Sequence, residues 1–256
     1  MGKVYLIGAG PGAADLITLR GAELLRRADV VFHDALVQPD MLALAGTAKL
    51  VAVGKRCSRI STDQRFINRN LVEAAAKYDV VVRLKGGDPM LFGRAQEEIA
   101  SLEAAGVPYE IVPGVTSALA ASAEVGVSLT QRGTSRSVVF ATPRVGEGED
   151  VSDWAPAVVQ ADTAVLYMAV GRAAEIAAIL EAQGMAASTP VVIVENASLP
   201  ASRHLGCTLR GLRNGAAQCL TGPALMLLGD VFRKRAQALI DAELVTSELT
   251  RQAVQR

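Results

Sequence analysis

The sequence is poor in aromatic residues and carries no net charge. Only 4% of its 256 residues are Phe, Trp or Tyr, which is too few to favour a surface that binds nucleic acid by stacking on its bases. Lysine and arginine together number 26, as do aspartate and glutamate, so no overall field would attract a polyanion. We therefore expect no nucleic-acid partner.

Cysteines and long apolar runs are also scarce. The three cysteines, Cys57, Cys207 and Cys219, are odd in number and fit no C-x-x-C spacing, which argues against a disulfide framework or a zinc site. No apolar run approaches the roughly 20 residues that span a membrane. The first residues, MGKVYLIGAG, lack the apolar core of a signal peptide. We expect a cytoplasmic protein with no metal and no membrane partner.

The sequence does contain a regular alternation of short apolar runs with longer segments of helical period. This rhythm is typical of βαβ units and predicts an α/β fold with mostly parallel sheets. A chain of 256 residues exceeds the usual single domain of roughly 100 to 200 residues, so we predict two such domains. Strands are predicted at residues 3–8, 29–34, 50–54, 79–85 and 109–114, and then at 137–142, 163–168, 190–196 and 224–229.

The domain boundary is predicted in the small-residue segment 112–129, which suits a helix packed tightly at a junction. We assign residues 1–117 to the first domain, 118–245 to the second and 246–256 to a tail. Helices are expected at 15–28 and 172–183, and Ser61 with Gln64 three residues later predicts a capping box that starts another.

A glycine-rich loop, GAGPG at 8–12, follows the first predicted strand. Gly8, Gly10 and Ala13, with Asp34 after the second strand, resemble a dinucleotide fingerprint and would favour an NAD-dependent oxidoreductase. Pro11 weakens that interpretation, because it removes a backbone N–H that should hold pyrophosphate. A further alternative is that the glycines only form a tight turn.

Two more loops of bare backbone follow predicted strands, at 86–89 (GGDP) and 113–116 (PGVT). The carboxyl ends of parallel strands lie at one edge of a sheet, so we expect these loops to meet. S-adenosylmethionine (SAM) would fit such a site, because it needs no phosphate cradle and its sulfonium lies well against carbonyl dipoles.

The motifs as a set are similar to the uroporphyrinogen-III C-methyltransferase family, in the family's order and over nearly the whole chain. They are GAGPG at 8–12, HDALV at 33–37, GKR at 54–56, RLKGGDPMLFGRAQEE at 83–98, VPGVTSA at 112–118, YMAV at 167–170, VENAS at 194–198 and GPALMLLGDV at 222–231. The resemblance implies a tetrapyrrole methylase (class III SAM methyltransferase) fold, an active site in the inter-domain cleft and a homodimer.

The resemblance also implies which residues contact SAM or its product, S-adenosylhomocysteine. They are Pro11, Gly86, Gly87, Asp88, Leu91, Thr116, Ser117, Met168, Ala197, Pro223, Ala224 and Leu225. Asp88 would accept hydrogen bonds from the ribose hydroxyls. The alternative for Asp88 is a turn or cap residue before Pro89.

The implied substrate, uroporphyrinogen III, is a tetrapyrrole with eight carboxylates. Residues 49–94 hold ten basic residues against four acidic ones and are our candidate for a positive funnel, although about half of these charges are expected on solvated helix faces. Arg94 and Glu97, three residues apart, would bind a substrate carboxylate and orient it, or else form an ordinary surface ion pair. Arg132 is a second candidate clamp.

The implied reaction is methyl transfer from SAM to C2 and then C7, giving precorrin-2 for sirohaem or cobalamin synthesis. By resemblance Asp34 would be the proton acceptor and Lys55 the donor. The alternatives are a structural role for Asp34 at the strand end and a carboxylate contact for Lys55. The chain starts directly at the glycine loop, so we expect methylation only, without the dehydrogenation and ferrochelation of fused sirohaem synthases.

The sequence departs from many relatives at two places, with Gln131 in place of a His and Thr142-Pro143-Arg144 in place of TGH. If these positions touch substrate, its affinity or the release of product would differ. The nearest alternative is a sister methyltransferase acting later on the corrin ring. HDALV, GKR and FGRAQEE favour the uroporphyrinogen enzyme over it.

Overall fold

The computed structural model describes residues 1–54, 64–145 and 152–254. The chain divides into two compact units, Met1–Ala120 and Ala121–Arg256. The division falls inside helix α5 (Ser117–Val125), a few residues beyond the expected boundary. Within the described ranges, no helix is long and apolar enough to cross a membrane.

The first unit is built on a five-stranded sheet in the order β3-β2-β4-β1-β5, and every neighbouring pair is parallel. The parallel arrangement predicted from the βαβ rhythm is confirmed here. The elements are β1 (Lys3–Gly8), α1 (Leu19–Arg26), β2 (Val30–His33), α2 (Pro39–Ala43), β3 (Lys49–Ala52), α3 (Gln64–Ala75), β4 (Val80–Lys85), α4 (Ala95–Ala104) and β5 (Tyr109–Val112), with a 3₁₀ turn at Ala14–Leu16.

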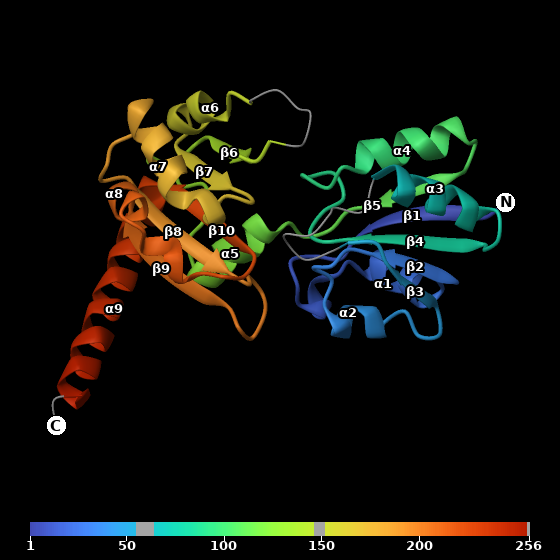
Figure 1. Cartoon of the computed structure of the whole chain (residues 1–256), viewed down its shortest axis with the longest axis horizontal. Helices are drawn as coiled ribbons and strands as arrows, with labels where there is room; N and C mark the ends of the chain where they lie inside the picture. The colour runs from blue at the N-terminus through green and yellow to red at the C-terminus, as the bar shows by residue number, and fades with distance from the viewer. Residues whose placement is uncertain (55–63, 146–151, 255–256) are drawn as a thin grey trace. The chain divides into compact units, whose positions relative to one another are not determined.

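Helices cover both faces of this sheet, with α3 and α4 on one face and α1 and α2 on the other (Figure 1). Alternate residues of β4 point to opposite faces, so Val81 packs with the α3 and α4 side chains while Val82 and Leu84 pack on the α1 and α2 side. By the same alternation Arg83 and Lys85 lie on the α3 and α4 face. They are buried there, which the apolar rhythm of the strand did not predict.

The start of helix α1 is set by a side-chain cap. Helix α1 begins at Leu19 rather than near residue 15, because the Thr18 side chain accepts a hydrogen bond from the Gly21 N–H at 3.1 Å. The predicted Ser61 capping box lies outside the described residues. Helix α2, which the sequence analysis did not predict, starts at a proline in the first-turn position that proline tolerates.

The second unit is built on a five-stranded sheet in the order β6-β7-β10-β8-β9. The elements are β6 (Val138–Ala141), α6 (Trp154–Gln160), β7 (Thr163–Leu166), α7 (Ala173–Ala182), β8 (Pro190–Glu195), β9 (Arg203–Thr208), α8 (Leu209–Arg213), β10 (Ala224–Gly229) and α9 (Arg233–Val254). Short 3₁₀ helices lie at Val170–Arg172, Ala216–Cys219 and Asp230–Phe232.

The prediction of a mostly parallel second sheet is wrong. Only β6 and β7 pair in parallel, whereas β7 with β10, β10 with β8, and β8 with β9 are antiparallel. The reason is β9, which the sequence analysis did not predict. The chain passes from β8 to β9 through residues 196–202 without a helix, and a connection that short can join only antiparallel neighbours.

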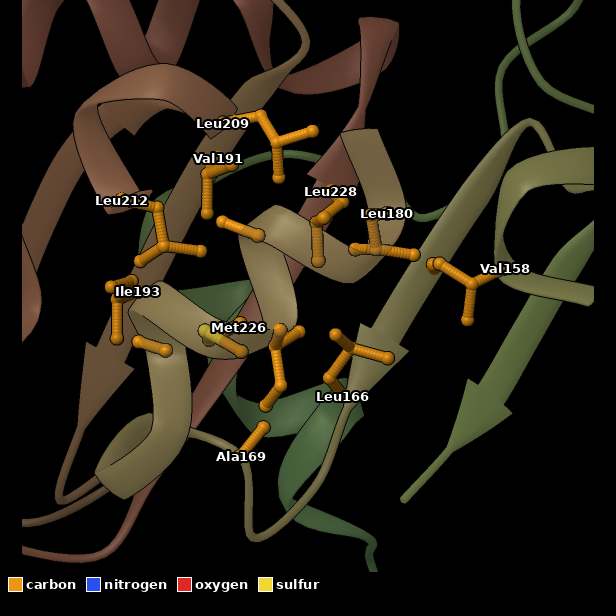
Figure 2. Close-up of a cluster of buried hydrophobic side chains, with 14 of the residues drawn as sticks. Val158, Leu166, Ala169, Leu180, Val191, Ile193, Leu209, Leu212, Met226 and Leu228 are labelled. Atoms are coloured by element: carbon orange, nitrogen blue, oxygen red, sulfur yellow. The ribbon is translucent and has the colours of Figure 1, made fainter. Parts of the chain in front are cut away.

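The core of the second unit lies between its sheet and helices α6, α7 and α8. Figure 2 shows Val158 of α6, Leu180 of α7 and Leu212 of α8 gathered over strand residues such as Leu166 and Ile193. All five side chains are fully buried, and burial of such side chains stabilises the fold by about 1.5 to 3 kcal/mol each.

Helix α9 packs against β9 at a glycine. A Cβ on Gly206 would lie 2.3 Å from the Ala236 carbonyl oxygen, so only glycine lets the helix approach this closely. The helix runs to Val254, through most of the stretch expected as a tail.

Candidate active site

The three glycine-rich loops of the first unit meet at the carboxyl edge of its sheet, as the sequence analysis expected. They follow β1, β4 and β5, which are neighbours in the sheet. Gly10 and Gly87 exchange backbone hydrogen bonds, at 3.2 Å from the Gly10 N–H and 2.7 Å from the Gly87 N–H. The loops therefore extend the pairing of the strands beyond their ends.

Close backbone approach explains two of the glycines. A Cβ on Gly8 would lie 2.5 Å from the Gly114 Cα, and a Cβ on Gly114 would lie 2.2 Å from the Gly87 carbonyl oxygen. Neither distance is possible for a real side chain, so the loops can meet only with glycine at these positions. Gly87 has φ +67°, a left-handed conformation that also favours glycine.

Asp88 joins two of these loops. One carboxylate oxygen accepts from the Met90 N–H and the other from the Gly114 N–H, both at 2.8 Å. The first contact is the turn role weighed as the alternative in the sequence analysis, and the second ties the GGDP loop to the PGVT loop. Each oxygen keeps a further lone pair that could accept from a ligand hydroxyl.

Asp34 follows β2 at the same edge of the sheet and is one-third exposed, at 32%. Its Oδ1 lies 2.5 Å from Nη2 of Arg83, and its Oδ2 accepts weakly from the Gly86 N–H at 3.4 Å. The carboxylate is thus held between a buried arginine and the first residue of the GGDP loop.

Arg83 is part of a buried group of charges beneath α4. Its Nε donates to Glu98 Oε1 at 2.9 Å, and Lys85 Nζ donates to both oxygens of Glu98 at 2.9 and 3.0 Å. Burial opposes the charge on Arg83, but Asp34 and Glu98 outweigh it, so its pKa is raised. Burial, reinforced by the charge of Arg83, lowers the pKa of Lys85.

The sequence analysis treated Arg83 and Lys85 as members of a positive funnel open to substrate, and the structure shows otherwise. Both are sealed from solvent and paired with Glu98, which was not singled out. The signal that could have found them is two charges at alternate positions of an otherwise apolar strand, VVVRLK, since alternate positions share one buried face.

Other basic residues of this stretch are exposed, namely Lys49, Arg65, Arg69, Lys77 and Arg94. Lys55, proposed as the proton donor, lies outside the described residues, as do Arg56 and Arg59.

Arg94 and Glu97 form a two-point ion pair at the start of α4, with Nε–Oε1 2.7 Å and Nη2–Oε2 2.8 Å. Both side chains are about half exposed. The structure therefore shows the surface ion pair that the sequence analysis weighed as the alternative. Arg94 also has φ +54°, a left-handed conformation that is strained for arginine. Arg132, the second candidate clamp, lies exposed in the turn that Gln131 and Ser135 close.

In the second unit, the residues expected to contact cofactor lie at one edge of the sheet. Met168 follows the end of β7, Ala197 follows the end of β8, and residues 223–225 begin the antiparallel strand β10 that lies between them. The Asn196 N–H donates to the Pro223 carbonyl at 2.8 Å, which joins two of these segments. Met168 is exposed and Ala197 is buried.

Glu195 fixes the turn before β10, and the sequence analysis did not identify it. It is buried, and its Oε1 accepts from the N–H groups of Thr221 at 2.7 Å and Gly222 at 2.5 Å. Arg203 balances its charge from the exposed side, at 3.3 Å. A carboxylate here sets the conformation of the backbone that leads into Pro223.

The part of the chain that the structure describes contains no set of side chains suited to bind a metal ion. No group of three or more His, Cys, Asp or Glu side chains there lies close enough to hold an ion.

Glycine loops that meet beyond three parallel strands, beside a partly exposed carboxylate, are typical of α/β enzymes that bind a small ligand against backbone groups. Comparison with known proteins narrows this class. Residues 3–213 match the model of the tetrapyrrole (corrin/porphyrin) methylases, which is most of the chain, so the chain belongs to that family and the predicted resemblance is confirmed.

Individual proteins similar to this chain support the same family assignment. The uroporphyrinogen-III C-methyltransferase of Pseudomonas aeruginosa is 43% identical over 91% of this chain and 95% of its own length. Siroheme synthase 1 of Klebsiella pneumoniae is 41% identical over 92% of the chain, which spans only about half of that longer protein, 50%. Among solved structures, uroporphyrin-III C-methyl transferase of Thermus thermophilus, complexed with S-adenyl homocysteine, has a TM-score of 0.80 at 40% identity, covering 91% of this chain and 94% of that one.

Proposed function

We propose that this protein is a SAM-dependent methyltransferase that methylates uroporphyrinogen III at C2 and C7, giving precorrin-2 and S-adenosylhomocysteine. The observation that carries the proposal is the junction of the three glycine loops. It stands in a chain that matches two proteins named as uroporphyrinogen-III or uroporphyrin-III methyltransferases over 95% and 94% of their lengths, and a siroheme synthase over 50% of its length.

The residues present fit a cofactor that lies against backbone. Among the described residues, a Cβ built on Gly86 would meet only the Leu36 Cβ at 3.8 Å, and one on Gly87 only the Thr116 Cα at 3.9 Å. This leaves space beside the GGDP backbone where carbonyl and amide groups can face a ligand. We propose Pro11, Gly86, Gly87, Asp88, Leu91, Thr116 and Ser117 in the first unit as cofactor contacts, with Met168, Ala197, Pro223, Ala224 and Leu225 in the second.

The bound cofactor would supply an electrophilic methyl group on a sulfonium. The protein's part is to align an electron-rich pyrrole carbon with that methyl at about 3 to 3.5 Å and to exclude water. The methylated ring then gives up a proton, and we propose Asp34 as its acceptor, because this carboxylate is one-third exposed and lies next to the GGDP loop. We propose Lys55 as the proton donor on the family resemblance alone.

Arg94 and Glu97 are proposed to work as a unit in binding substrate. In the structure Glu97 holds the guanidinium through Nε and Nη2 in a two-point geometry, and a carboxylate of the substrate could bind by taking the place of Glu97 on this fork. Arg132, exposed on the second unit, is proposed as a further carboxylate contact. Arg94→Ala should leave S-adenosylhomocysteine affinity unchanged and lower turnover strongly; equal turnover would make the pair only a surface ion pair.

We further propose that the protein is a cytoplasmic homodimer that serves sirohaem or cobalamin synthesis. The support is the similarity to siroheme synthases and to a free-standing methyltransferase. Sedimentation at micromolar concentration tests the dimer, and a monomer there would contradict it.

The function is tested by competition between substrates. The protein is incubated anaerobically with methyl-labelled SAM and either uroporphyrinogen III or a later corrin-ring intermediate. We expect label on uroporphyrinogen III. Label only on the later intermediate would assign the protein to the sister enzymes. No transfer to either, with NAD rather than SAM retained by the purified protein, would favour the oxidoreductase.

A further inference from the structure

The buried charges beneath α4 are unusual because burying a charged side chain has a large cost in solvation free energy. Arg83, Lys85 and Glu98 are each 3% exposed or less. Removing charged groups from water costs more than a hydrophobic core would, and replacing such groups by packed apolar side chains is often neutral or stabilising. Their presence beside the proposed reaction site therefore calls for a role other than stability.

The hydrogen bonds of these buried charges run from Glu98 through Arg83 to Asp34. Glu98, on α4, holds Arg83 through Nε, and the Phe32 and Leu84 carbonyls accept from Nη1 at 3.4 and 3.2 Å. This fixes the plane of the guanidinium, so that Nη2 is aimed at Asp34 Oδ1 at 2.5 Å. Asp34 is the one member of the group with substantial exposure.

We infer that Arg83 and Glu98 are positioning residues that orient Asp34 and fix the charge that lies beside it. This rests on the proposed function, in which Asp34 is the proton acceptor. Arg83 holds one oxygen of the carboxylate, while Glu98 fixes Arg83 and balances its charge. Lysine could not replace Arg83, because it lacks the planar fork that serves four acceptors at once.

The other groups around Asp34 in the described ranges are few. Lys85 lies next to Arg83 on the same face of β4 and is bound to Glu98. The His33 Nδ1 lies 3.2 Å from the Asp34 carbonyl oxygen, on the backbone side. Gln64 of α3, which is neutral, donates to Glu98 at 3.3 Å. The nearest charge that acts on the carboxylate is thus Arg83, and its nearest partner is Glu98.

Two variants that change the charge beside Asp34 in opposite directions should shift the acid side of the kcat–pH profile in opposite directions. A purely structural role of Arg83 and Glu98 would not produce shifts of opposite sign. Glu98→Gln leaves Arg83 without its anion, so Asp34 holds a proton less readily and the acid side of the kcat profile should move to lower pH. In the double variant Arg83→Gln/Glu98→Gln, Asp34 loses its cation and the acid side should move to higher pH, by about one unit. The double variant removes one charge of each sign and leaves the buried Lys85 without Glu98, so its folding is checked by thermal melts.

The experiment measures methyl transfer to uroporphyrinogen III across pH for the wild type, both variants and Arg83→Lys. S-adenosylhomocysteine affinity is measured by calorimetry. Arg83→Lys should lower kcat about a hundredfold, as expected for a misplaced catalytic group, with unchanged affinity. The control, Lys3→Gln, breaks the Lys3–Glu110 pair at the opposite edge of the same sheet and should change neither quantity.

Shifts of opposite sign in the two variants would support the inference. The inference would be overturned if the kcat–pH profiles of the two variants stayed in place or moved in the same direction, or if Arg83→Lys kept full kcat. In either case, activity of the wild type would leave the proposed function intact. If the double variant does not fold, the kcat and affinity of Arg83→Lys decide. A wild type that methylates no tetrapyrrole would overturn the proposed function, and this inference with it.

Discussion

Backbone strain marks the same segments that the motifs do. Phe92, Arg94, Met168, Asn196 and Ser198 adopt left-handed backbone conformations, with φ between +53° and +70°. Such conformations cost about 1 to 3 kcal/mol each for residues with a Cβ and persist where surrounding structure enforces them. Arg94 and Met168 are proposed site residues, and the other three are their neighbours or flank Ala197. The strain holds side chains at angles that relaxed turns would not give.

Gly114→Ala tests the junction of the glycine loops. The new Cβ would lie 2.2 Å from the Gly87 carbonyl, so the GGDP and PGVT loops must separate. We expect S-adenosylhomocysteine affinity to fall about tenfold or more, equivalent to about 1.4 kcal/mol, while the fold survives. Gly171→Ala, which meets nothing within 4 Å, is the control. Unchanged affinity in the Gly114 variant, measured by calorimetry, would contradict a binding role for the junction.

The cysteines of the second unit should differ in reactivity. Burial raises the pKa of the Cys207 thiol to about 12, so it carries almost no thiolate at neutral pH, whereas Cys219 is exposed. We predict that iodoacetamide labels Cys219 in the native protein and Cys207 only after denaturation, as read by peptide mass mapping. Equal labelling of both would mean that the core around β9 opens readily.

The sequence analysis identified site residues that are recognisable by residue type, such as glycines after strands. It missed residues whose role depends on burial and on neighbours distant in the sequence. Gly8, Gly10 and Gly87 could be identified because bare backbone after a strand has few uses. Glu98 and Glu195 could not, because an isolated glutamate in a sequence does not show whether it is buried or which N–H groups it accepts from. Their roles depend on neighbours brought together by the fold.

At the scale of elements, a carboxylate ties α5 to the β8–β9 connection. Glu124 accepts from the Ser198 N–H at 2.6 Å, from Ser202 Oγ at 2.7 Å and lies 3.2 Å from His204 Nε2. Burial alone would raise its pKa, but the bonds from Ser202, Ser198 and His204 prevail and lower it. The connection carries Ala197, so the contact supports a proposed cofactor segment.

Glu124→Gln should reduce stability in a pH-dependent way. Because the folded-state pKa is lowered, the contribution of Glu124 is present above its usual value of 4.5 and is lost as the pH falls through the lower folded-state value. We expect a loss of less than about 1 kcal/mol near neutral pH, since the group is partly exposed. Thermal melts should show the difference from wild type shrinking below pH 4.5. A difference independent of pH, or one equal to that of the exposed control Glu23→Gln, would contradict this.

The strands of the first unit were predictable from their apolar runs, whereas helix α2 was not. The second sheet was not, for a specific reason. Strand β9, RHLGCT, has no apolar run and packs under α9 only because Gly206 admits the helix backbone. Without β9 the alternation of strands and helices looked unbroken, and the antiparallel pairing of β10 with β8 had no visible cause.

At the scale of the whole molecule, the two units contribute different kinds of groups. The first supplies the glycine junction and the buried charges that end at Asp34. The second supplies the turn before β10, which Glu195 fixes, and the left-handed Ser198, whose N–H donates to Glu124. Acidic and basic residues are equal in number, so the proposed polyanionic substrate would be bound through local charges, and raised salt should weaken its binding more than that of the cofactor.

The central claim, two methyl transfers to uroporphyrinogen III, is tested most directly by the mass of the tetrapyrrole after exhaustive anaerobic reaction with excess SAM. The account predicts a macrocycle heavier by two methyl groups, with two molecules of S-adenosylhomocysteine formed for each. An unchanged macrocycle, with SAM intact, would contradict it.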